Sequence, residues 1–191
     1  MMSVFVKSFA EPPFSVKEIM RYAGCFAHDS DTLDLVQAVI EESRDAFTYK
    51  VCYTTLPVTL KGDVIDLGAF SLSSKKLAEN LKNAREVLLF AATVGVGIDR
   101  LIGKYSRISP SRALLFQALG SERVEALCDA FCKSFEKPLC PRFSPGYGDL
   151  TLDCQREIFS LLNCPKNIGL TLNSSMLMSP TKSVTAFAGI K

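Results

Sequence analysis

The chain has 191 residues, of which 48% are hydrophobic and 22% charged, and its formal net charge is +2. This length and composition predict one soluble globular domain over residues 1–191, and the small net charge argues against nucleic acid or an acidic membrane surface as a partner. No apolar run approaches the ~20 residues of a membrane span. The seven cysteines are scattered and no secretory leader precedes them, which favours reduced thiols in a cytoplasmic protein.

The N-terminal part of the chain predicts a short strand followed by two helices. Ser15, with Glu18 three residues later, is typical of a helix start, and Gly24 is a helix stop. A second helix is expected over residues 31–47 from apolar residues that lie approximately on one face, namely Leu33, Val36, Ile40 and Phe47.

The next part of the chain changes character. Two extended stretches within residues 49–70 flank Lys61-Gly62, which predicts a hairpin. A third helix is expected over residues 73–84. The unbroken apolar run over residues 86–95 is typical of a strand that is buried on both faces.

The longest helix is expected over residues 110–136, with Ser109 as its cap and Pro110 in its first turn. One face carries a stripe of small residues with a single acid, which would let another element or a ligand approach the backbone: Ala118, Ser121, Glu125, Cys128 and Cys132. The better core candidates are Leu115, Leu119, Ala126, Leu127, Ala130 and Phe131.

The C-terminal part predicts one more helix and two strands. The helix is expected over residues 152–162, and the strands over residues 168–172 and 183–190 lie around a Ser-Pro-Thr turn. Because hairpin signals accompany the alternating helices and strands, we expect an α+β fold with a mixed or antiparallel sheet.

Several familiar kinds of site are disfavoured. Cys128 and Cys132 share a helix face, but a zinc site needs three or four ligands and the single histidine, His28, is far away in sequence, so buried thiols are the favoured interpretation. The GVGIDR stretch at 95–100 lacks the third glycine and the later acid of a dinucleotide fingerprint, and it reads as a plain strand-to-helix turn. No GxSxG elbow indicates a serine hydrolase.

The stretch RFSPGYGD at residues 142–149 is more informative. Its Ser-Pro-Gly core predicts a turn, because proline fixes φ and glycine allows positive φ. The guanidinium of Arg142 is a fixed fork that matches a carboxylate in two parallel hydrogen bonds. Two interpretations remain open: a site for a small anionic or zwitterionic ligand, or an arginine that braces the turn through its carbonyl groups.

These residues resemble the activation domain of cobalamin-dependent methionine synthase, here as a free-standing subunit. Arg142, Gly146 and Tyr147 match the R-x-x-x-G-Y motif with which that family binds S-adenosylmethionine. The stretch ALGSERVEA at 118–126 resembles the family's helix with a ligand-side glutamate, which implies that role for Glu125.

Two further stretches, FAATVG at 90–95 and SSMLMSPTKSVTAFAGI at 174–190, extend the resemblance to residues 85–190. It implies a bent, mixed or antiparallel sheet flanked by helices. It also implies that Arg142 binds the carboxylate of S-adenosylmethionine, that the backbone around Ser144 and from Gly146 to Tyr147 holds its methionyl and adenosine parts, and that Glu125 accepts from its ammonium or a ribose hydroxyl.

The resemblance also implies a function. In that family, cobalamin oxidised to cob(II)alamin is reduced by a flavodoxin-like or other one-electron donor, and S-adenosylmethionine then methylates the cobalt. The chain would be an accessory subunit of a cobalamin-binding methionine synthase, with no catalytic acid or base and no metal ligand of its own. Two alternatives remain: an activator of another corrinoid methyltransferase, or a non-catalytic scaffold that senses S-adenosylmethionine.

Overall fold

The computed structural model describes residues 3–25 and 30–191. The helices are α1 (Val16–Ala23), α2 (Ser30–Glu42), α3 (Lys75–Leu81), α4 (Gly97–Tyr105), α5 (Pro110–Lys133), α6 (Gln155–Leu162) and α7 (Cys164–Ile168), with 3-10 turns η1 (Arg44–Ala46) and η2 (Leu152–Cys154). The strands are β1 (Phe5–Phe9), β2 (Tyr49–Pro57), β3 (Thr59–Lys61), β4 (Val64–Asp66), β5 (Ser71–Ser73), β6 (Glu86–Thr93), β7 (Thr171–Leu172), β8 (Met178–Ser179) and β9 (Ser183–Ile190). None of the helices in the described ranges has the length and apolar content that crossing a membrane requires.

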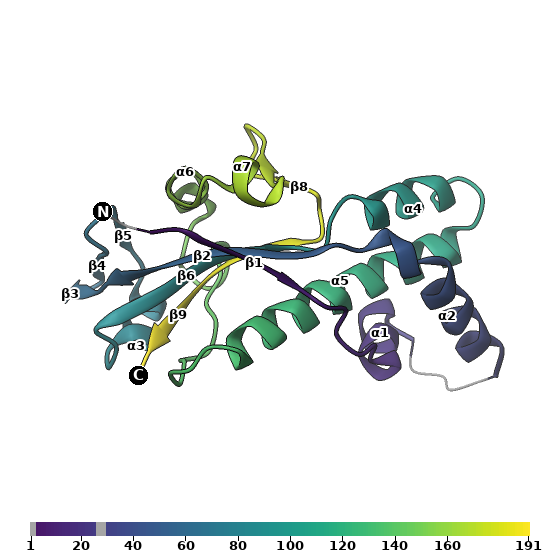
Figure 1. The fold of residues 1–191 in the computed structure, drawn as a ribbon, viewed down its shortest axis with the longest axis horizontal. Coiled ribbons are helices and arrows are strands. Elements are labelled where there is room, and N and C mark those ends of the chain that lie inside the picture. The colour runs from purple at the N-terminus through teal and green to yellow at the C-terminus, as the bar shows by residue number, and fades with distance from the viewer. Residues whose placement is uncertain (1–2, 26–29) are drawn as a thin grey trace.

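A four-stranded antiparallel sheet with the order β1-β2-β6-β9 forms the centre of the molecule (Figure 1). In its register, Tyr53 of β2 pairs with Phe5 of β1 on one side and with Phe90 of β6 on the other. Phe90 also pairs with Ala186 of β9. Two smaller sheets, β3-β4-β5 and β7-β8, are antiparallel as well. The predicted α+β class, with an antiparallel sheet flanked by helices, is confirmed.

Each face of the central sheet has its own hydrophobic core. Leu88, Phe90 and Ala92 of β6 belong to the core shared with α5. The alternate residues Leu89 and Ala91 belong to the core shared with α3, α6 and α7. Figure 1 shows α1 and α5 on one side of the sheet and α6 and α7 on the other. Because strand side chains alternate between faces, β6 is buried on both, as its apolar run predicted.

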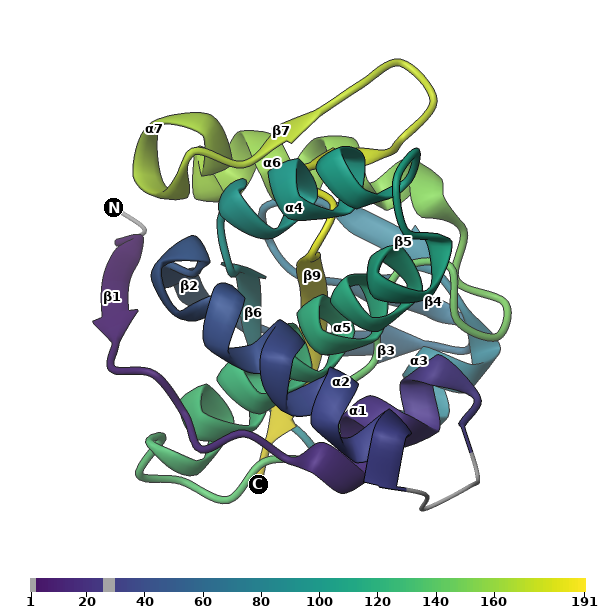
Figure 2. The same cartoon turned by 90° about the vertical axis from the view of Figure 1, so that its right-hand side faces the viewer.

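Helix α5 is the longest helix, and α1, α2 and α4 pack around it (Figure 2). It begins at Pro110 as predicted, but the Ser109 side chain makes no capping bond, and the helix ends at Lys133 rather than at residue 136. Of its predicted core residues, those that are buried are Leu115, Leu119, Leu127 and Phe131. Ala126 and Ala130 are only half-buried.

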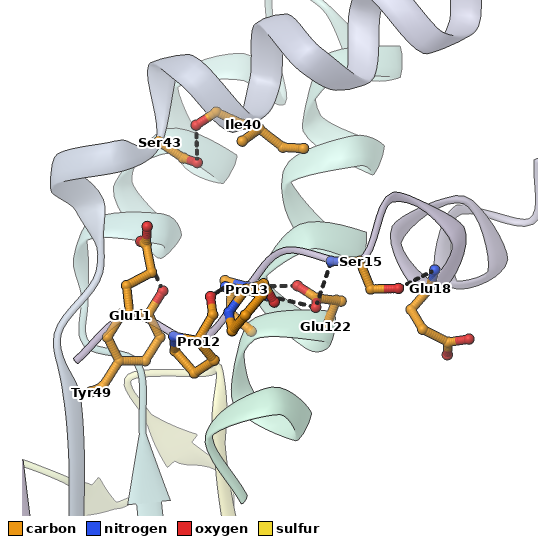
Figure 3. A network of polar contacts seen from close by, with 10 residues as sticks. Glu11, Pro12, Pro13, Ser15, Glu18, Ile40, Ser43, Tyr49 and Glu122 are labelled. Atoms are coloured by element: carbon orange, nitrogen blue, oxygen red, sulfur yellow. Dashed lines mark hydrogen bonds and ion pairs between the residues drawn. The ribbon is translucent and has the colours of Figure 1, made fainter. Parts of the chain in front are cut away.

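Helix α1 follows its sequence signals closely, whereas helix α2 is shorter than predicted. The Ser15 hydroxyl accepts from the Glu18 N–H at 3.3 Å, and Gly24 ends α1 with φ of 67°. Helix α2 ends at Glu42, five residues before the predicted end at residue 47. There the Ser43 hydroxyl donates to the Ile40 carbonyl at 2.8 Å, a side-chain bond that competes with helix continuation (Figure 3).

The predicted hairpin and C-terminal strands are correct in part. Lys61-Gly62 joins β3 to β4, with Lys61 paired to Val64, while the residues before it form β2 of the central sheet. The strand predicted over residues 168–172 is reduced to β7, because α7 extends to Ile168. Strand β9 matches its predicted range of 183–190.

The GVGIDR stretch forms the predicted turn between β6 and α4 and brings two backbones into contact. A Cβ on Gly97 would lie 2.1 Å from the carbonyl oxygen of Ala46, whereas a Cβ on Gly103 of the same helix would meet nothing within 4 Å.

We expect Gly97→Ala to lower the free energy of unfolding by about 2–4 kcal/mol, because the backbone at Ala46 must move to make room for the added methyl group. Gly103→Ala, the matched control, should raise it by up to about 1 kcal/mol. Equal effects in urea unfolding would contradict this packing.

Candidate functional site

A groove of about 520 Å³ lies between the N-terminal segment with α1 and helix α5. One wall is formed by Pro12, Pro13, Ser15, Glu18, Arg21 and Tyr22, and the other by Glu122, Glu125, Ala126, Asp129, Ala130 and Lys133. The α5 wall is therefore acidic and has two small side chains, which explains why Ala126 and Ala130 are not in the core. The opposite wall adds one aromatic ring.

A buried ion pair on α5 fixes the N-terminal wall of this groove. The Arg123 guanidinium is fully buried, pairs with Glu122, and donates to the carbonyls of Pro12 and Pro13 at 2.6 and 2.7 Å. The Ser15 N–H donates to the Glu122 carboxylate at 3.2 Å (Figure 3). The start of α1 is thus attached to α5 by polar contacts as well as by packing.

The structure brings two of the sequence-predicted site residues, Glu125 and Arg142, into direct contact. Nη2 of Arg142 donates to the Glu125 carboxylate at 2.8 Å, and Nη1 donates to Asp129 at 2.6 Å. The Arg142 side chain is 24% exposed, against 44% for Glu125 and 58% for Asp129. Because the two acids are four residues apart on α5, the guanidinium spans one helical turn. Arg142 is therefore bound to side chains rather than to the carbonyls of its own turn.

The three residues of this ion-pair triad line two adjoining hollows. Glu125 lines the α1–α5 groove, whereas Arg142 lines a second, more open hollow of about 670 Å³ together with Cys132, Cys140 and Lys191. Asp129 and Lys133 line both hollows. A ligand that contacts Glu125 and Arg142 together must lie across this boundary.

The small-residue stripe on α5 is largely covered by the protein itself. The Lys182 ammonium donates to the Ser121 hydroxyl at 3.0 Å, and the Lys182 stem lies over Gly120. Cys128 is buried. Among the stripe residues, Glu125 is the one that reaches the groove, so the close approach predicted from small side chains is made by another element of the fold.

The remaining predicted site residues form a tight turn. The Tyr147 N–H donates to the Ser144 carbonyl at 3.1 Å, and the Gly146 N–H donates to Leu150 at 2.8 Å with Gly146 at φ of 86°. The Tyr147 ring packs edge-on against Phe143 at 5.2 Å and is 66% exposed. The structure shows no contact between the Tyr147 ring and Glu125. The ring is exposed and therefore accessible to a ligand or a partner protein.

Asp149, at the end of this turn, attaches it to α3. Its carboxylate accepts from the Ser74 hydroxyl at 2.6 Å and from the N–H groups of Lys75 and Lys76. The bond from Ser74, and then those backbone groups, hold the pKa of Asp149 below its usual value. A carboxyl with a lowered folded-state pKa stabilises the fold at neutral pH, and the stabilisation is lost as pH falls through that pKa.

Asp149→Asn should therefore reduce the dependence of stability on pH below about pH 5, where a free aspartate begins to protonate. The measurement is the midpoint of thermal unfolding of both proteins between about pH 2 and pH 7. The difference between them is expected to be largest at neutral pH and to shrink in acid. A difference that stays constant with pH would show that the carboxylate charge is irrelevant.

The thiols near the site are buried or half-buried. Burial raises the pKa of Cys128 and of Cys132, so both remain protonated at neutral pH and the charge of Arg142 is balanced by carboxylates. Within residues 3–25 and 30–191, no three His, Cys, Asp or Glu side chains are arranged to hold a metal ion. His28 lies outside those residues.

Sequence reasoning missed the buried pair and the α1 wall. Arg123 occupies a position four residues after Leu119 and four before Leu127, in an otherwise apolar row. A charge in such a row is a signal for a buried, paired side chain. The α1 residues that face Glu125 gave no comparable signal, because their meeting with α5 depends on the tertiary fold.

Comparison with known proteins gives a match in structure but none in sequence. No protein-family model and no curated protein sequence matches the chain. Among solved structures, the chain is similar to the crystal structure of the MetH reactivation domain bound to AdoHcy, with a TM-score of 0.71 and 14% sequence identity. The match covers 99% of this chain and 78% of that one. The fold of this chain is therefore that of the MetH reactivation domain, and an identity this low establishes likeness of fold alone.

Proposed function

We propose that this protein binds S-adenosylmethionine and supports reductive methylation of cob(II)alamin on a cobalamin-binding methionine synthase. The observation that carries the proposal is the direct contact between Glu125 and Arg142, two residues singled out by motif resemblance, within the fold of a domain whose solved structure contains AdoHcy.

The chemistry of the residues suits such a ligand. S-adenosylmethionine has a carboxylate, an ammonium and a sulfonium, and so it needs one anion-binding group and an acidic surrounding. Arg142 offers a guanidinium fork for the carboxylate, and Glu125 offers an oxygen acceptor for the ammonium. Tyr22, on the opposite wall of the groove, adds an aromatic ring, one face of which the Arg21 guanidinium covers at 4.3 Å.

The task proposed for this chain is positioning rather than acid-base chemistry. When bound, S-adenosylmethionine supplies the methyl group that its sulfonium releases to cobalt after a flavodoxin-like or other donor has delivered one electron. The residues of this chain bind the two charged ends of the amino-acid part and so limit where the sulfonium can lie. Fixing one reactant in this way lowers the entropy cost of transfer.

The test combines a binding measurement and a transfer measurement. Calorimetric titration of S-adenosylmethionine into the protein should show binding. Methyl-labelled S-adenosylmethionine, a cobalamin-loaded methionine synthase and a one-electron reductant should then give labelled methylcobalamin only when this protein is present. Binding without transfer would favour a sensing scaffold, and transfer only to a different corrinoid protein would favour the other activator. An absence of binding in both the free and the partner-bound protein would contradict the proposal.

A further inference from the structure

Both terminal amino groups of Arg142 are already in use. Nη1 donates to Asp129 and Nη2 donates to Glu125, at 2.6 and 2.8 Å. Each of these amino groups has two N–H donors, and a ligand carboxylate that binds as a fork across both amino groups meets the two acids there. It must therefore share them with the two α5 acids or replace at least one of the two.

The two acids are not equivalent in position. Of the two hollows, Glu125 lines only the α1–α5 groove, where its carboxylate can accept from a ligand ammonium. Asp129 lies at the boundary of the groove and the second hollow, which Arg142 lines. Asp129 is also the more exposed acid, with 58% of its side chain accessible against 44% for Glu125. Water therefore screens the contact of Asp129 with Arg142 more strongly, and that contact is the easier one to exchange.

We infer that Asp129 is a positioning residue that holds Arg142 against α5 until the carboxylate of the ligand takes its place. The inference rests on the proposed function. Before binding, Asp129 competes with the ligand carboxylate for Arg142. In the bound state, Asp129 does not contact the ligand. For a ligand with a carboxylate the exchange has a cost, because the ligand must displace Asp129 from the guanidinium. Ligands without a carboxylate leave both ion pairs of Arg142 intact, and their binding affinity does not depend on Asp129.

The experiment compares two ligands by calorimetric titration: S-adenosylmethionine, and 5′-methylthioadenosine, which lacks the amino-acid part. Asp129→Asn removes the charge that competes for Arg142. It should tighten S-adenosylmethionine binding about fivefold, equivalent to about 1 kcal/mol, and leave 5′-methylthioadenosine unchanged. The matched control is Glu18→Gln, which removes one charge from the same groove without contact to Arg142. It should give no gain.

Three results would overturn the inference. They are weaker S-adenosylmethionine binding by Asp129→Asn, an equal gain for both ligands, and an equal gain in Glu18→Gln. If the wild-type protein binds neither ligand, the proposed function fails. The role of Asp129 is then measured without a ligand, by nitrogen-15 spectra of the arginine side chains. The Arg142 signals, assigned by their loss in Arg142→Lys, should show slow rotation of the guanidinium in the wild type and faster rotation in Asp129→Asn. Identical spectra would contradict the inference without reference to any ligand.

Discussion

Arg142→Ala is expected to weaken S-adenosylmethionine binding about 30-fold, or about 2 kcal/mol. A pair of charge-assisted hydrogen bonds to a carboxylate is lost, and part of that loss is offset because the wild-type arginine must give up a contact with α5. Glu125 and Asp129 lose their partner but are both well exposed, so the fold should remain intact. The measurements are calorimetric titration and thermal unfolding of the same samples.

Two controls separate the guanidinium fork from simple charge. Arg142→Lys keeps the charge but loses the planar fork, and it should recover only a part of the lost affinity. Binding of 5′-methylthioadenosine, which has no carboxylate, should be nearly the same in all three proteins. If Arg142→Ala binds S-adenosylmethionine as tightly as the wild type does, the carboxylate is bound elsewhere and the motif assignment is wrong.

Arg123→Ala is expected to have the largest effect on stability, a loss of about 3–5 kcal/mol in the free energy of unfolding. The substitution leaves the buried carboxylate of Glu122 without its cation and the carbonyls of Pro12 and Pro13 without their donors. It also removes the guanidinium that lies 3.9 Å from the Phe14 ring centre. Urea unfolding followed by circular dichroism measures the change.

The chain contains a closely matched control for this prediction. Arg21 also pairs with a nearby glutamate, Glu18, and also lies over an aromatic ring, that of Tyr22 at 4.3 Å, but its side chain is exposed. Arg21→Ala should therefore leave the free energy of unfolding nearly unchanged. Similar losses in the two variants would mean that burial of Arg123 has no energetic consequence.

Most elements of the fold could be predicted because their signals are local. The apolar run of β6, the Ser15 and Gly24 ends of α1, and Pro110 at the start of α5 each act over a few residues. The errors also have local causes. Helix α2 ends early where the Ser43 side chain bonds to the backbone, and the strand expected from residue 168 is shortened by α7.

Only part of the candidate site could be predicted from the sequence, namely Glu125, Arg142 and the turn that follows Arg142. Sequence motifs indicated Glu125 and Arg142, and the Ser-Pro-Gly turn predicted the positive φ found at Gly146. Motifs gave no reason to include Asp129, since its importance comes from reaching the same guanidinium as Glu125. Whether these residues bind S-adenosylmethionine stays a prediction.

Local sequence patterns were enough to predict the alternation of helices and strands, the buried central strand and the turn that follows Arg142. The packing of the tertiary structure places the start of α1 opposite Glu125 as a wall of the groove, and it brings Arg142 onto two acids of α5. The physical reason is distance along the chain. Helix and turn preferences act over a few residues, whereas the bond from Ser15 to Glu122 spans 107 residues and forms only when the packed core has brought α1 onto α5.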